Sequence, residues 1–65
     1  MKASELQTVA AMNRFGGSFV KALANVMIVA DENNQVRIET AFPEIFDRYR
    51  QMAKDLDQYD KEESQ

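Results

Sequence analysis

Apolar residues are most concentrated between Phe15 and Ala30, where Lys21 and Asn25 are the only polar residues after Ser18. At 100° per residue, one broad face of this segment carries Phe19, Leu23, Val26, Met27 and Ala30. This spacing predicts a helix over residues 18–30 that is apolar on nearly every side. Such a helix must be covered by the rest of the chain or by a second copy of it.

A glycine pair, Gly16 and Gly17, precedes this helix. A glycine that follows a helix often takes a left-handed backbone conformation because it has no Cβ to clash, so we expect Gly16 to close the preceding helix. Ser18 is a natural N-cap, since its hydroxyl can accept a hydrogen bond from a free backbone N–H. The pair is therefore predicted to form the corner between two helices.

The segment before the glycines predicts a helix over about residues 4–15. Ser4 is followed three residues later by Gln7, which is the spacing of a capping box. A narrow apolar face follows at helical spacing, made of Leu6, Val9, Ala10 and Met12.

The segment from Asp31 to Phe42 is compatible with two structures. As a helix over about 32–41, it has Asp31 as its N-cap and apolar residues at helical spacing. As a strand, Val36 to Thr40 alternates between apolar and polar residues and could pair with Val26 to Val29 in a hairpin at about 26–40. We favour the helix, because an isolated two-stranded hairpin is weak unless it packs on helices.

Pro43 marks the start of the last predicted helix, which covers residues 43 to about 60. Proline has no N–H and pushes the preceding residue out of the helical region, so one helix ends before it and another begins at it. Steps of four and three residues then connect a row of apolar side chains: Ile45, Tyr49, Met52, Leu56 and Tyr59. This row fits either a two-heptad seam between copies or packing against the 18–30 helix. Residues 61–65 have no apolar anchor and are expected to fray.

Together these elements predict an all-α fold, a single domain of three to four helices over residues 1–60 with an acidic tail at 61–65. A chain of 65 residues buries only about 60% of its unfolded surface, so its core is marginal. The chain contains no Cys and no His, which excludes a disulfide framework and a usual zinc site. We therefore expect a homodimer to complete the burial of the 18–30 helix. The alternative fold is α+β, with the 26–40 hairpin.

The charge balance argues against direct contact with nucleic acid. Eight Lys and Arg residues are interspersed with eleven acids, for a net charge of −3, whereas nucleic-acid binders carry a basic patch. The first residues lack the apolar run of a signal peptide. The central apolar stretch is shorter than the roughly 20 residues that span a bilayer. We therefore expect a cytoplasmic protein that binds other proteins and does not associate with a membrane.

No group of residues in the sequence has the types and spacing that indicate a catalytic site. The carboxylates Glu44 and Asp47 are followed at helical spacing by Arg48 and Arg50, as on a solvated helix face. The run 31–34 lacks the glycine and the terminal glutamate of a calcium loop, and the Gly-Gly-Ser corner lacks the lysine of a phosphate loop. We expect no enzyme, no cofactor and no metal.

Aromatic and long apolar residues of the last helix are the candidates for a partner or dimer surface. The set is Phe42, Phe46, Tyr49, Met52, Leu56 and Tyr59. The same residues could equally fill the core.

Two stretches resemble short, mostly uncharacterised proteins encoded by bacteriophages and prophages. One runs from Arg14 through the glycine pair to Ala24, and the other is Ala41-Phe42-Pro43-Glu44. The resemblance spans about residues 13–50 and carries no site residues over. It implies a helical 31–42 segment and a location in the cytoplasm of an infected bacterium. It further implies a non-enzymatic accessory protein that binds a host or phage protein.

A DNA-binding or DNA-mimicking regulator of phage development is the alternative function. The glycine-containing turn between two helices permits a helix-turn-helix. Its second helix, however, offers only Ser18, Lys21 and Asn25 to a major groove.

Overall fold

The computed structural model describes the backbone of residues 1–63 and the side chains of residues 1–57. Its elements are α1 (Ala3–Phe15), α2 (Ser18–Val29), α3 (Glu32–Ala41) and α4 (Pro43–Glu63). No strand occurs between residues 1 and 63. The all-α prediction is therefore confirmed, and the hairpin at 26–40 does not form.

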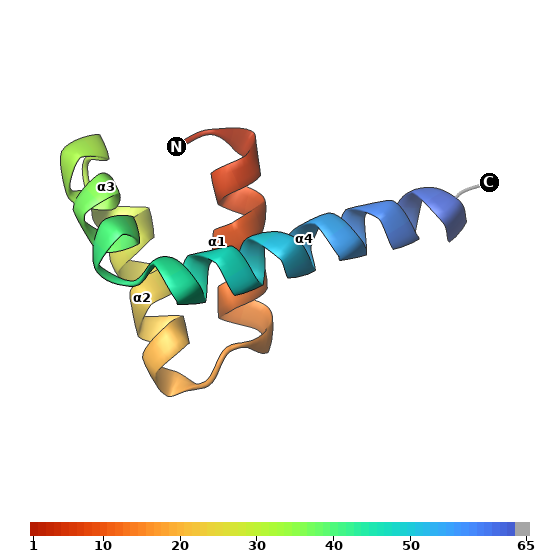
Figure 1. The fold of residues 1–65 in the computed structure, drawn as a ribbon, viewed down its shortest axis with the longest axis horizontal. Helices are drawn as coiled ribbons and strands as arrows, with labels where there is room; N and C mark the ends of the chain where they lie inside the picture. The colour runs from red at the N-terminus through yellow and green to blue at the C-terminus, as the bar shows by residue number, and fades with distance from the viewer. Residues whose placement is uncertain (64–65) are drawn as a thin grey trace.

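The first helix, and not the second, lies at the centre of the fold. Helix α1 packs extensively against both α2 and α4, whereas α3 contacts α2 and α4 less extensively. Figure 1 shows α4 crossing α1, with the C-terminal part of α4 extending away from the other helices. The predicted packing of the Pro43 helix against the 18–30 helix is therefore wrong, because α4 packs mainly against α1.

The core is small and is shared by three helices. Its three largest fully buried side chains are Met12 from α1, Met27 from α2 and Phe46 from α4. The complete set of buried apolar residues is Val9, Ala11, Met12, Leu23, Ala24, Met27, Phe46, Tyr49 and Ala53. Because one third of these residues are alanines, the helices approach closely and the chain buries few large side chains.

Helix α2 is exposed along much of its length, so the rest of the chain does not supply the cover that its apolar faces were predicted to need. Within α2 only Leu23, Ala24 and Met27 are buried. Phe19 is 56% exposed and Val29 is 83% exposed. The reason is the central position of α1, which covers one side of α2 while α4 lies mainly against α1.

The predicted caps are right for α3 and wrong for α1 and α2. The Asp31 carboxylate accepts a hydrogen bond of 2.8 Å from the backbone N–H of Asn34, so Asp31 is the N-cap of α3. Helix α1 begins at Ala3 with Lys2 as N-cap, which places Ser4 inside the first turn, where it cannot form a capping box. Gly17 takes the N-cap position of α2, and Ser18 is its first helical residue.

Gly16 ends α1, but not in a left-handed conformation. Its φ of −76° and ψ of 159° are extended values that any residue can adopt. A Cβ at this position would instead lie 2.5 Å from the Met12 carbonyl oxygen and 2.5 Å from the Val20 Cγ1 atom. The position therefore needs glycine for space, because the end of α1 passes close to the first turn of α2.

The buried amide of Gln35 joins α2 to α3. Its side chain, 8% exposed, donates hydrogen bonds to the carbonyl oxygens of Met27 (3.0 Å) and Ala30 (3.1 Å). The last carbonyls of a helix have no partner within the helix, so these bonds satisfy groups at the end of α2. One side chain thereby fixes the corner between the two helices.

Helix α4 begins at Pro43, as predicted, and continues to Glu63, beyond the end expected near residue 60. A helix of 21 residues is about 31 Å long, since each residue adds 1.5 Å. The remainder of the predicted tail, Ser64 and Gln65, lies outside the described residues.

Candidate functional site

The predicted α4 interaction set does not form one exposed surface. Phe46 is 1% exposed and Tyr49 is 8% exposed, so both belong to the core of the chain and are not available to a partner. Met52 and Leu56 are half-buried, and Phe42 lies at the surface. The last member of the set, Tyr59, lies outside the described side chains. Near the start of α4, the apolar side chains of Phe46 and Tyr49 thus pack within their own chain.

An apolar groove lies between α2 and α3, and we call it the α2–α3 groove. Its volume is about 390 Å³, and it is lined by Val26, Val29, Ala30, Asn34, Arg37, Ile38, Ala41 and Phe42. Only Asn34 and Arg37 among these residues are polar, and none is acidic. Of these residues, Phe42 belonged to the predicted interaction surface of the last helix, and Val26, Val29 and Ala30 belong to the helix that a homodimer was expected to cover.

An aromatic pair extends this groove toward the start of α2. The rings of Phe19 and Phe42 meet edge to face, with centroids 5.6 Å apart and planes at 72°. Phe19 lies seven residues before Val26, and therefore two helical turns along the same face of α2. The exposed apolar surface thus continues from Val29 through Val26 to the aromatic pair.

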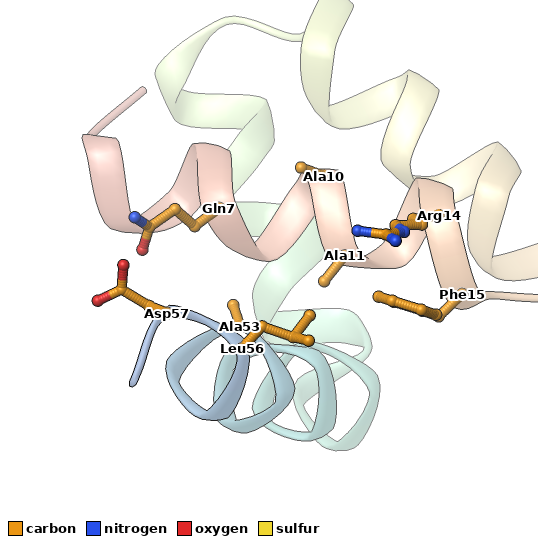
Figure 2. A pocket seen from close by; sticks show the side chains of 8 residues that line it. All are labelled: Gln7, Ala10, Ala11, Arg14, Phe15, Ala53, Leu56 and Asp57. Carbon is orange, nitrogen blue, oxygen red and sulfur yellow. The ribbon is translucent and has the colours of Figure 1, made fainter. Parts of the chain in front are cut away.

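A second groove, the α1–α4 groove, has a volume of about 220 Å³. It is lined by Gln7, Ala10, Ala11, Arg14, Phe15, Ala53, Leu56 and Asp57. Figure 2 shows the alanines in the middle of the groove, with Gln7 and Asp57 at one end and Arg14 and Phe15 at the other. The Arg14 guanidinium carbon lies 4.9 Å from the centre of the Phe15 ring, at cation–π distance.

A third cleft, between the start of α1 and α3, contains several carboxylates. It is lined by Met1, Lys2, Glu5, Glu32, Gln35, Val36 and Glu39, and has a volume of about 420 Å³. Partial burial and the nearby Glu5 charge raise the pKa of Glu39, against the opposing effect of Arg50. The carboxylate charge on Glu39 is therefore disfavoured in the folded state.

The described side chains contain few groups arranged for chemistry. Among the described residues, no three potential metal-ligating side chains cluster together. Among residues 1–57, every buried side-chain nitrogen or oxygen has a hydrogen-bond partner. The predicted pair of Asp47 and Arg50 forms, with a distance of 2.5 Å, at the solvent-exposed surface. Such a pair contributes at most about 1 kcal/mol to stability.

The Gly16-Gly17 corner connects α1 to α2, as a helix-turn-helix would require, and α2 exposes Lys21 and Asn25. No helix in the described part of the chain is long and apolar enough to cross a membrane.

Comparison of the chain with family models, with curated proteins and with solved structures finds no match. The α2–α3 and α1–α4 grooves are therefore interpreted from their own geometry and chemistry.

Proposed function

We propose that this protein is a small, non-enzymatic accessory protein of a bacteriophage or prophage that acts as a homodimer in the host cytoplasm. It works by binding a host or phage protein. The observation that carries this proposal is the α1–α4 groove, where an arginine stacked on an aromatic ring borders an open depression with an apolar wall.

The residue types of this groove are those that dominate protein–protein recognition. Arginine and aromatic side chains are enriched among the residues that contribute most binding energy. Arg14 is already held against Phe15 in the free chain, so less side-chain freedom is lost on binding. Leu56 supplies apolar contact, while Gln7 and Asp57 give the groove a polar edge, as in interfaces that form and dissociate.

The groove also has the space that a partner side chain needs. The alanines at positions 10, 11 and 53 have short side chains, which leave the depression of about 220 Å³ between the two helices. An apolar or acidic side chain of a partner would fit there, with the acid paired to Arg14.

The test is affinity capture from bacterial lysate with three versions of the chain: wild type, Arg14→Glu and Lys21→Glu. Lys21 is exposed on α2 and lines neither groove, so Lys21→Glu makes the same change in charge outside both proposed binding surfaces. We expect one specific protein to be captured by wild type and Lys21→Glu and lost with Arg14→Glu. Circular dichroism checks that all three remain helical.

Equal capture by Arg14→Glu and wild type would contradict the assignment of the α1–α4 groove. Capture of no specific protein by wild type at near-native levels would contradict protein binding itself. The DNA-binding alternative predicts a salt-sensitive mobility shift of duplex DNA, which Lys21→Glu would weaken. No shift at low ionic strength would exclude it.

A further inference from the structure

We propose that the α2–α3 groove is the homodimer interface and that its occupant is the same groove of a second copy of this chain. The inference rests on the homodimer in the proposed function and assigns its surface. It leaves the α1–α4 groove free for another protein.

The surface area of the chain supports a second copy. The described fold exposes 4862 Å², whereas a compact monomer of 7.5 kDa exposes about 4200 Å² on the usual scaling with mass. The excess of about 600 Å² matches the area that one partner buries in a small specific interface. The exposed face of α2, with Phe19, Val26 and Val29, supplies apolar area of the kind that dimers bury.

The charge of the chain selects this groove among the three concave surfaces. Two copies with a net charge of −3 each repel one another. The cleft beside Glu39 carries three glutamates and the α1–α4 groove carries Asp57, whereas no acid lines the α2–α3 groove. The interiors of homodimer interfaces are more apolar than other protein surfaces, and this groove fits that description.

The shape of the surface allows it to pair with itself. Val29 stands out at the end of α2 with 83% of its surface exposed, beside the hollow between α2 and α3. In a twofold dimer, residue i of one copy meets residue j of the other and the reverse. Val29 of each copy can therefore enter the hollow of the other, so that one arrangement covers both exposed valines.

The first experiment measures molar mass in solution by light scattering after size exclusion, over a range of protein concentrations. The variants are Val29→Glu and the matched control Leu6→Glu, which places the same charge on an exposed apolar residue of α1 outside the groove. We expect wild type and Leu6→Glu to reach twice 7.5 kDa at high micromolar concentration, and Val29→Glu to remain at 7.5 kDa. Circular dichroism must show that both variants keep the helical content of wild type.

The possible outcomes separate the two claims. A wild-type monomer at high micromolar concentration would overturn both the dimer and its assignment. A Val29→Glu variant that still dimerises would overturn the groove alone, and the homodimer would stand. Loss of dimer in Leu6→Glu, or in both variants together, would also overturn the assignment to this groove.

A second measurement does not depend on a disruptive charge. Because the chain has no cysteine, a single introduced cysteine can carry a spin label without background. We expect the distance between the two labels of a Val29→Cys dimer to be shorter than that of a Leu6→Cys dimer. The reverse order would place the interface elsewhere.

Discussion

At the scale of single residues, Gly16 shows a requirement for space and not for an unusual backbone conformation. Its backbone angles suit any residue, but the place of a Cβ is already filled by the Met12 carbonyl oxygen and the Val20 side chain. Gly17 offers a matched comparison, because a Cβ there would meet nothing within 4 Å.

We expect Gly16→Ala to lower the free energy of unfolding by about 1–3 kcal/mol, as for other overpacked sites. Gly17→Ala should change it by less than about 0.5 kcal/mol, because reduced chain entropy in the unfolded state offsets the loss of glycine at an N-cap. Urea unfolding of both variants measures the difference. Equal losses would show that the close contact at Gly16 relaxes without cost.

Gln35 is the second residue on which the fold depends. Replacing it with leucine keeps its approximate volume but leaves the Met27 and Ala30 carbonyls without their amide donor. We expect Gln35→Leu to cost about 1–3 kcal/mol in unfolding free energy. Gln51→Leu, which removes the amide of an exposed side chain bonded to Asp55, should cost less than about 0.5 kcal/mol. A Gln35 variant as stable as the Gln51 variant would contradict the role of this joint.

At the scale of helices, the sequence predicts where elements begin more reliably than which of their faces meet. Asp31 starts α3 by accepting a hydrogen bond from a backbone N–H, and Pro43 starts α4 through the geometry of its ring. Both effects act over a few residues, so the starts of α3 and α4 can be predicted from a short stretch of sequence. Ser4 and Ser18 have side-chain oxygens that could cap a helix as Asp31 does, but Ser4 is the second residue of α1 and Ser18 is the first residue of α2. The N-cap of α1 is Lys2, which is not a preferred N-cap residue, and the N-cap of α2 is Gly17, which is a weaker preference than the neighbouring Ser18.

The difference between a used and an unused cap is measurable. Asp31→Ala removes the carboxylate that accepts from the Asn34 N–H, and should lower the unfolding free energy by about 1 kcal/mol. Ser18→Ala should change it by less than about 0.5 kcal/mol, because Ser18 makes no cap hydrogen bond. If chemical denaturation ranks the two variants in the opposite order, the assignment of the caps is wrong.

The contact of α3 with the rest of the fold contains an unfavourable charge. Burial and the Glu5 charge raise the pKa of Glu39 above its ordinary value of 4.5. The folded state therefore binds a proton more readily than the unfolded state, and the ionised carboxylate opposes folding at neutral pH. This penalty disappears as the pH falls from above the raised pKa to below 4.5.

We expect Glu39→Gln to be more stable than wild type at pH 7, and the gain to vanish near pH 3. Urea midpoints measured across this range give the difference directly. Glu44→Gln is the matched control, since Glu44 lies in the first turn of α4, where a negative charge is favourable. It should be slightly less stable than wild type at pH 7. A Glu39 variant that loses stability at neutral pH would show that its attraction to Arg50 dominates.

At the scale of the molecule, the fold class was predictable and the arrangement of the helices was not. Helical spacing and turn residues predicted three of the helices because those signals are local, whereas residues 31–42 fitted both a helix and a strand and the helix was favoured because an isolated hairpin is weak. The central place of α1 was missed because its predicted face was partly wrong: Val9 and Met12 are buried as expected, but Thr8 and Ala11 are buried in place of Leu6 and Ala10. Small residues let helices approach closely, so α1 contacts two helices with little apolar surface of its own.

The sequence also could not show which apolar faces meet the core of the chain and which remain exposed, because this depends on how distant helices pack. The apolar row on α4 indicated contact correctly, but Phe46 and Tyr49 meet the core of their own chain. The excess apolar residues of α2 predicted a helix that needs cover from the chain or from a second copy, and within one chain Val29 and Phe19 remain exposed. Arg14 and Phe15 carried no signal, because a neighbouring cation and ring become a groove only when α4 lies across α1.

The proposed dimer predicts that thermal stability depends on protein concentration. Association stabilises the folded state by mass action, so the Tm of wild type should rise with each tenfold increase in concentration. The Tm of Val29→Glu should stay constant over the same range. A concentration-independent Tm for wild type across the range where the dimer forms would contradict the coupling of folding to association.

The contact between α1 and α4 has a consequence for how the chain is made. The contacts of α1 with α2, of α2 with α3 and of α3 with α4 join neighbours in sequence across links of one or two residues, whereas this extensive contact joins the first helix to the last. Met12 and Val9 therefore have no cover from Phe46 or Tyr49 until α4 has been synthesised. Helices α1 and α2 can pack together earlier, but the core is complete only when the last helix folds back across the first.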